Sequence, residues 1–90
     1  MASEHLFLNR TTNGDSSVKE FSTPITVWLE GTYNGCTITL SVARESGGTF
    51  VPIKVSTTPE VVPVIMTGKF YLKATVASAG GSTSVTVATT

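Results

Sequence analysis

The chain alternates apolar and polar residues through most of its length, which is the pattern of half-buried β-strands. The alternation is clearest in residues 25–30 and 36–43, in which nearly every second residue is apolar. Asn34-Gly35 stands between these segments, and this dipeptide is the strongest short signal for a β-hairpin. We therefore predict two paired strands joined by a tight turn. Their predicted inward residues are Ile25, Val27, Leu29, Cys36, Ile38, Leu40 and Val42.

Five further segments have strand-like composition, and prolines mark two of them. The segments are residues 18–21, 49–55, 60–66, 69–77 and 82–88, with turns at 44–48, 67–68 and 78–81. Pro52 and Pro63 lie within the second and third segments. Because proline has no backbone N–H to donate, the segment 49–55 is expected at a sheet edge or with its N–H side facing solvent. In the segment 60–66, Pro63 is expected to limit the ladder pairing.

The chain as a whole predicts an all-β fold. No segment of ten or more residues repeats its apolar positions every 3.6 residues, as an amphipathic helix does. Turns recur about every 8–12 residues, and the last, at 78–81, is expected to close a hairpin. In the later segments the residues that share a phase are Val51, Ile53 and Val55; Phe70, Leu72, Ala74 and Val76; and Val85 and Val87. We expect one domain, a small antiparallel β-sandwich or barrel of about six to eight short strands.

Residues 1–17 differ from the rest and are expected to precede a sandwich domain at 18–90. Leu6, Phe7 and Leu8 make a short apolar patch, which a polar run follows. Polar runs of this kind form turns or loose loops. The segment is therefore either an arm that reaches a neighbouring subunit through this patch or the first strand of the domain itself.

Composition and charge exclude several partners. Apolar residues make up 40% of the chain and charged residues 13%, with a net charge of zero. Little electrostatic repulsion therefore opposes self-association. The six basic residues are scattered, which argues against nucleic acid as a partner. No apolar run approaches the roughly 18 residues of a membrane span, and the N-terminus lacks the basic start of a signal peptide. We expect no membrane partner and assembly in a cytoplasm.

Few residues are available for chemistry. His5 is the only histidine and lies in the N-terminal segment, so a Ser/His/Asp or Cys/His set is not expected. Cys36 is the only cysteine, which excludes an intrachain disulfide, and its phase predicts a small buried hydrophobe. The carboxylates are dispersed rather than spaced as metal ligands. We expect no enzyme, no cofactor and no metal site.

Three aromatic residues fall in the outward phase of their strands. Trp28 alternates with the apolar residues around it, Tyr71 does the same, and Phe50 falls opposite Val51 and Ile53. Outward aromatics are favoured anchors of subunit interfaces or ligand-binding faces. Alternatively, both faces of the sheet are buried, or a β-bulge reverses the phase. The predicted interface residues are Leu6, Phe7, Leu8, Trp28, Phe50 and Tyr71.

Residues 31–42 (GTYNGCTITLSV) and 45–53 (ESGGTFVPI) resemble a family of small structural proteins of tailed bacteriophages. The family's pattern runs Gly-aromatic-x-Gly-x-Thr-hydrophobic-Thr-Leu, followed by a Gly-Gly-Thr-aromatic-Val turn and strand. A later Gly-aromatic-hydrophobic-basic strand is similar to residues 68–74, with Lys69 inserted, and the closing Gly-Ser-Thr-Ser-Val is similar to residues 81–85.

The resemblance implies a β-sandwich that assembles on a larger protein shell, often as a trimer, and it carries no catalytic residues. It favours a capsid decoration or cement protein that stabilises the head shell. The expected partners are the major capsid protein or another virion protein, and further copies of the chain, with a homotrimer favoured. The expected location is the virion, assembled in the host cytoplasm. The alternative is a tail- or fibre-associated module that binds host surface carbohydrate, with Trp28, Tyr33 and Tyr71 as stacking platforms.

Overall fold

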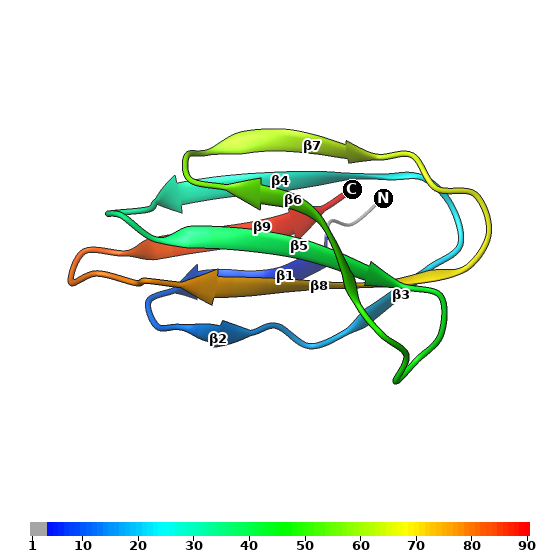
Figure 1. The fold of residues 1–90 in the computed structure, drawn as a ribbon. Helices are drawn as coiled ribbons and strands as arrows, with labels where there is room; N and C mark the ends of the chain where they lie inside the picture. Colours follow the sequence, from blue (N-terminus) through cyan, green and yellow to red (C-terminus); the bar gives the residue numbers. More distant parts are fainter. Residues whose placement is uncertain (1–3) are drawn as a thin grey trace.

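The computed structural model describes residues 4–90, which form nine β-strands. The strands make two antiparallel sheets that pack together around one core (Figure 1), which confirms the predicted β-sandwich. There are more strands than expected because the residues ahead of position 18 contribute β1 (Glu4–Arg10) and β2 (Gly14–Asp15). The shortest dimension of the molecule, 17 Å, fits two sheets about 10 Å apart with their outer side chains. No helix in the described part of the chain is long and apolar enough to span a bilayer.

Each sheet draws its strands from distant parts of the chain. The remaining strands are β3 (Lys19–Phe21), β4 (Ile25–Thr32), β5 (Thr37–Ala43), β6 (Val51–Ser56), β7 (Glu60–Val64), β8 (Phe70–Ala77) and β9 (Ser84–Thr89). Sheet A has the order β1-β9-β4-β7. Sheet B has the order β2-β8-β5-β6, and β3 also pairs with β8. Sheet B lies in front of sheet A in Figure 1.

The inward phases predicted for the four central strands are confirmed. Alternate residues of β4, β5, β8 and β9 meet between the sheets because the side-chain period of a strand is two. The fully or nearly fully buried members of this core are Val27, Leu29, Cys36, Ile38, Leu40, Phe70, Leu72, Ala74, Val76, Val85 and Val87. Cys36 is a free, buried thiol, and burial raises its pKa. This cysteine is therefore a packing residue, as its phase predicts.

The described part of the N-terminal segment belongs to the sandwich. β1 pairs with β9 in sheet A, with two irregularities in register. Leu6 and Phe7 are buried in the core, whereas Leu8 is 64% exposed. The first three residues of the expected segment 1–17 lie outside the described residues. Residues 4–10 are thus a strand of sheet A.

The predicted hairpin at Asn34-Gly35 is wrong in its pairing, although its turn is present. Asn34 and Gly35 have φ values of 48° and 85°, as the central residues of a type I′ turn do, and the Cys36 N–H donates to the Tyr33 carbonyl at 3.0 Å. However, β4 pairs with β7 and β9, and β5 pairs with β6 and β8. The turn therefore carries the chain from one sheet to the other. The two strands could pair within one sheet or face each other from two sheets. Alternation alone cannot distinguish these arrangements, because both bury the same face of each strand.

The predicted hairpin at 78–81 is wrong for the same reason. It joins β8 of sheet B to β9 of sheet A. The two crossings lie together at one end of the sandwich (Figure 1), where the Gly80 N–H donates to Thr83 Oγ1 at 2.8 Å and that hydroxyl donates to the Tyr33 carbonyl at 2.7 Å. Among strands consecutive in the chain, β5 and β6 do pair with one another, so the turn at 44–48 closes a hairpin.

The two proline-bearing strands lie at sheet edges, which was predicted for the strand with Pro52 but not for the strand with Pro63. β6 ends sheet B and β7 ends sheet A. The register of β6 against β5 shifts between Leu40 and Ser41 of β5, which marks a bulge. Val51 consequently pairs with the inward Val42 and Val55 with the outward Thr39, so the two valines lie on opposite sides of the strand, and Val51, Ile53 and Val55 are all exposed. The single phase expected for Val51, Ile53 and Val55 is therefore wrong.

Candidate interaction surfaces

The polar side chains of residues 4–90 do not gather into a reactive centre. No group of three or more His, Cys, Asp or Glu side chains in this range is placed to hold a metal ion. His5 is exposed on β1, remote in sequence and environment from the buried Cys36. The most connected polar cluster is instead centred on Ser56, at the end of β6.

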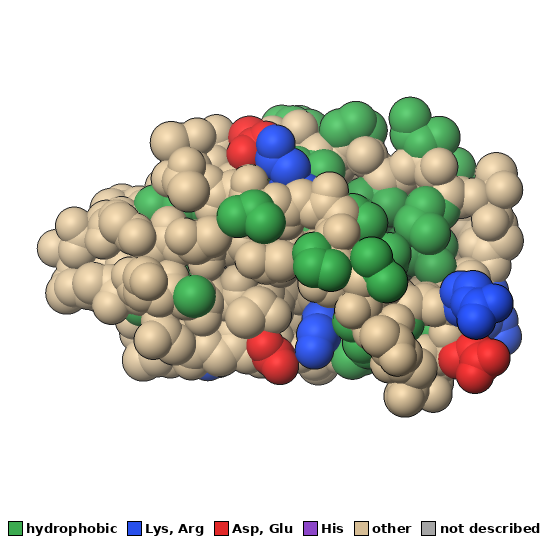
Figure 2. All heavy atoms as spheres, in the orientation of Figure 1, with side chains coloured by type: hydrophobic (Ala, Val, Ile, Leu, Met, Phe, Trp, Pro, Cys, Tyr) green, Lys and Arg blue, Asp and Glu red, His purple; other side chains and the backbone are tan. Residues whose placement is uncertain are grey.

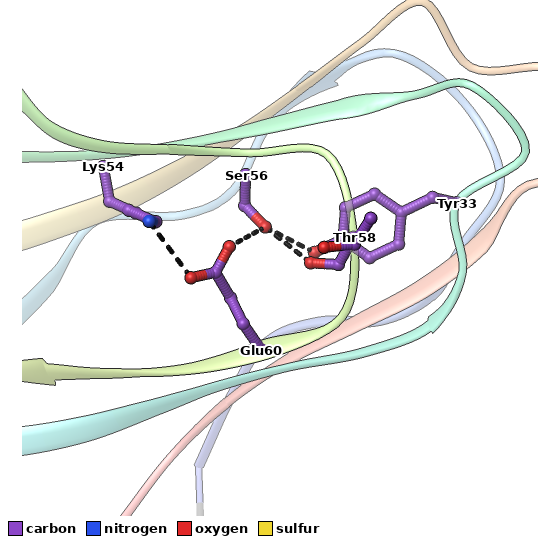
Figure 3. A network of polar contacts seen from close by, with 5 residues as sticks. All are labelled: Tyr33, Lys54, Ser56, Thr58 and Glu60. Atoms are coloured by element: carbon purple, nitrogen blue, oxygen red, sulfur yellow. Dashed lines mark hydrogen bonds and ion pairs between the residues drawn. The ribbon is translucent and has the colours of Figure 1, made fainter.

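Ser56 is the hub of a small hydrogen-bonded network (Figure 3). Its Oγ lies 3.1 Å from the Tyr33 hydroxyl, 2.7 Å from the Thr58 carbonyl oxygen and 2.8 Å from Glu60 Oε2. The serine hydroxyl has one proton, so at any time it donates either to the Thr58 carbonyl oxygen or to Glu60 Oε2. The Tyr33 hydroxyl in turn donates to the serine oxygen. Burial raises the pKa of the Tyr33 hydroxyl, which keeps it a donor. Ser56 is only 1% exposed, so a substrate has no access to it.

Glu60 extends this network to the surface. Its Oε1 lies 3.1 Å from Lys54 Nζ, and the hydrogen bond from Ser56, followed by the interaction with Lys54, lowers the pKa of the carboxyl group. Lys54 belongs to β6 in sheet B and Glu60 to β7 in sheet A. The network therefore fastens the two edge strands across the open side of the sandwich. Its role is structural.

The first exposed apolar surface lies on the outer face of sheet A. Trp28 of β4 and Val61 of β7 are direct cross-strand partners, and they are 40% and 49% exposed. The Trp28 indole N–H donates to Thr90 Oγ1 at 3.1 Å, which restrains the ring. We call this pair the Trp28 surface. A restrained aromatic ring beside a branched side chain is the composition of an interface anchor.

The second group of exposed apolar residues lies along β6. Val51, Ile53 and Val55 are 58%, 43% and 59% exposed, and we call these residues the β6 surface, although the bulge places Val51 and Val55 on opposite sides of the strand. Figure 2 shows hydrophobic side chains gathered along the course of β6 and towards the edge above it, while the opposite end of the same face carries few. Ile65, just after β7, is 81% exposed. These residues contribute nothing to the buried core.

A pocket of about 580 Å³ lies at one end of the β6 surface. Its walls come from the end of β5, the 44–49 turn and the connection from β7 to β8. Val51, Met66 and Phe70 supply apolar lining, whereas Arg44, Lys69 and Glu45 bring charges of both signs. The mixed charges give the pocket no strong preference for an anion or a cation.

The structure separates the residues predicted for an interface. Leu6 and Phe7 are buried in their own domain, while Leu8 and Trp28 are exposed. Phe50 and Tyr71 are partly exposed, and Phe50 lies under Lys73 Nζ, 4.8 Å from its ring centroid. These residues therefore do not form one continuous patch.

The three stacking platforms suggested for a carbohydrate site are also separate. Tyr33 is buried and hydrogen-bonded to Ser56, so its ring is not open to a sugar. Trp28 belongs to sheet A and Tyr71 to sheet B. Nothing in this arrangement brings aromatic faces together around one ligand.

The sequence analysis missed the exposure of Val51, Ile53, Val55, Val61 and Ile65. A signal was available, because Pro52 already predicts an edge strand and Pro63 limits the pairing of its own strand. Edge strands of a small sandwich have one neighbour and contribute less to the core, so their apolar residues are often left outside.

No protein-family model matches the chain, and no curated protein or solved structure is detectably similar to it.

Proposed function

We propose that this chain is a structural protein of a bacteriophage virion, a capsid decoration or cement protein that stabilises the head shell through subunit contacts. The resemblance of residues 31–53 to small virion proteins supports the proposed place in a virion. The Trp28 surface carries the proposal, because it gives a small sandwich a preformed apolar anchor on one outer face. In this proposal the role is assembly rather than catalysis.

The size of the anchor suits repeated weak contacts. Two half-exposed side chains are much less than the roughly 800 Å² per partner of a standard stable interface. On a shell, however, many identical sites are presented together, and contacts made through linked copies reinforce one another. A neutral chain also meets no long-range repulsion as copies crowd on a surface.

Co-sedimentation with capsid shells tests this proposal. Purified protein is mixed with heads of the parent virus that lack it, and the bound fraction is measured after centrifugation. We expect the native chain to bind and Trp28→Ser to bind at least about tenfold more weakly, because a desolvated aromatic anchor is lost. Val18→Ser is the matched control, since Val18 is 45% exposed and lies between β2 and β3.

Three outcomes are informative. Binding by the native chain and by Val18→Ser, but not by a folded Trp28→Ser, supports the proposal. Absence of the native chain from the sedimented heads contradicts shell binding. Equal binding by all three proteins contradicts the Trp28 surface as the contact.

A further inference from the structure

We propose that Asn34-Gly35 is a covalent modification site, at which the folded protein converts asparagine to aspartate or isoaspartate, while the fold protects Asn13-Gly14 from the same reaction. These are the two Asn-Gly dipeptides of the chain. A following glycine favours deamidation because it places no side chain beside the attacking backbone nitrogen. The inference is independent of shell binding, since it concerns the chemistry of a single copy.

The reaction needs only water as a co-reactant. The backbone nitrogen of Gly35 attacks Cγ of Asn34, an N–C bond forms, and the side-chain amide leaves as ammonia together with the proton of the attacking nitrogen. Water then adds to either carbonyl of the resulting succinimide ring and breaks the adjoining C–N bond. Opening at the side-chain carbonyl gives aspartate, and opening at the backbone carbonyl gives isoaspartate.

The peptide group between Asn34 and Gly35 is held from neither side. Both residues are exposed, and their turn lies at the end of the sandwich (Figure 1). Within residues 4–90, the Asn34 carbonyl and side-chain amide have no hydrogen-bond partner, and the Gly35 N–H donates no hydrogen bond. The attacking nitrogen and the amide that it attacks are therefore free to meet.

The turn can also reach the geometry of ring closure. Asn34 and Gly35 have φ values of 48° and 85°, as in a type I′ turn. Closure of the ring turns the following peptide group over, which converts a type I′ turn into a type II′ turn. The first central residue then keeps its positive φ and the second becomes negative. Glycine adopts both signs of φ readily, and the space around Gly35 is open.

The asparagine of the other dipeptide is held at two points. Asn13 Oδ1 accepts a hydrogen bond from the Ala79 N–H at 2.8 Å, which fixes the side-chain amide. The Asn13 carbonyl oxygen accepts one from the Arg10 guanidinium at 2.7 Å. Rotation of this peptide group would break the hydrogen bond to Arg10, so ring closure is opposed here.

The attacking nitrogen of that dipeptide belongs to the ladder of sheet B. Gly14 pairs with Val76 of β8. Two residues along, the Ser16 N–H donates to the Ala74 carbonyl oxygen at 2.7 Å. Because hydrogen-bonded pairs alternate along an antiparallel ladder, Gly14 and Val76 form such a pair too. Deamidation at Asn13 therefore requires β2 to open from β8 first.

Conversion at Asn34 acts on the contact between the two sheet crossings. It adds one negative charge to a chain whose net charge is zero. Isoaspartate also lengthens the main chain directly after Tyr33, whose carbonyl oxygen accepts hydrogen bonds from the Cys36 N–H and Thr83 Oγ1. The site thus lies where a covalent change reaches both crossings.

Peptide mapping by mass spectrometry tests the proposal. The folded protein, and the same protein in concentrated urea, are incubated at mildly alkaline pH while conversion of each asparagine is followed. In the folded chain Asn34 should convert about tenfold faster than Asn13 or more, since only Asn13 requires local opening. In urea neither dipeptide is held, so the two rates should become similar.

Two variants test the structural cause. Asn34→Gly retains a residue that tolerates positive φ and should abolish the acidic form on isoelectric focusing. Arg10→Met removes the hydrogen bond to the Asn13 carbonyl and should speed conversion at Asn13 about threefold or more. Arg44→Met, which removes an exposed arginine from the 44–48 turn, is the matched control and should leave that rate unchanged.

Three results would overturn the proposal. The first is equal conversion of Asn13 and Asn34 in the folded chain. The second is an Asn34 that stays unmodified while the chain in urea converts. The third is a rate difference that persists in urea, because the fold would then not be its cause.

Discussion

At the scale of single residues, the most consequential side chain is a small one. Ser56 joins the Tyr33 hydroxyl, the Thr58 carbonyl and the Glu60 carboxylate within hydrogen-bonding distance of one oxygen. It holds the point at which the chain leaves sheet B for sheet A. Because Tyr33 is also buried, its hydroxyl depends on the serine in place of water.

Replacing this hub should destabilise the fold. We expect Ser56→Ala to lower the free energy of unfolding by about 1–3 kcal/mol, because it leaves the buried Tyr33 hydroxyl without its acceptor. Urea denaturation followed by intrinsic fluorescence measures the change. Ser82→Ala, at an exposed turn position, should change the free energy by no more than about 0.5 kcal/mol. Equal effects of the two substitutions would contradict the network's role.

Glu60 makes part of the stability depend on pH. Its pKa lies below the ordinary value of 4.5 because Ser56 and Lys54 favour the ionised form. The folded state therefore binds fewer protons than the unfolded state in this range. The contribution is complete above the unfolded pKa and is lost as the pH falls through the lower folded pKa.

The measurement is the free energy of unfolding from about pH 6 to about pH 3. We expect Glu60→Gln to be less stable than the native chain near neutral pH and to lose less stability on acidification. Asp15→Asn provides a comparison, since a hydrogen bond from Thr75 lowers the pKa of Asp15 on a different strand. Parallel pH profiles for the native chain and Glu60→Gln would show that this carboxylate does not titrate as described.

At the scale of elements, the strand crossings define the fold more than the strands do. Gly31 lies near the end of β4 with a φ of 107°, and a Cβ there would meet the Ser84 carbonyl oxygen of β9. Gly35, in the following turn, has a φ of 85° but open space around it. Substitutions at Gly31 and Gly35 therefore separate the cost of a positive φ from the cost of a clash with the neighbouring backbone.

We expect Gly31→Ala to destabilise the protein by about 2–4 kcal/mol, because it combines an unfavourable φ with a backbone clash. Gly35→Ala should cost about 1–2 kcal/mol, since only the left-handed conformation is strained. Thermal and urea unfolding of both variants measures the difference. If Gly35→Ala is the more damaging substitution, the tight packing of β4 against β9 at this point is contradicted.

The same elements show what sequence alone could and could not predict. Alternation places Val27, Leu29, Ile38 and Leu40 inward, and all four are buried. Asn34-Gly35 indicates a tight turn, and the turn forms. The pairing partners were mispredicted because neighbouring strands in a sandwich bury the same phase whether they pair or face each other. That choice depends on contacts between distant segments, such as β4 with β9.

At the scale of the whole molecule, the sandwich has a closed core and two open apolar surfaces. The core uses the central strands, so the edge strands β6 and β7 are left with exposed branched side chains. The Trp28 surface was anticipated from the outward phase of one aromatic residue. The exposure of Val51, Ile53 and Val55 was not, because the bulge breaks the single phase that spacing alone suggested.

Electron cryo-microscopy of the parent virion tests the central proposal most directly. Our account predicts density for this nine-stranded sandwich on the outside of the head, with the sheet A face that carries Trp28 directed towards the shell. A head without this density, or the sandwich found only on a tail or fibre, would contradict it.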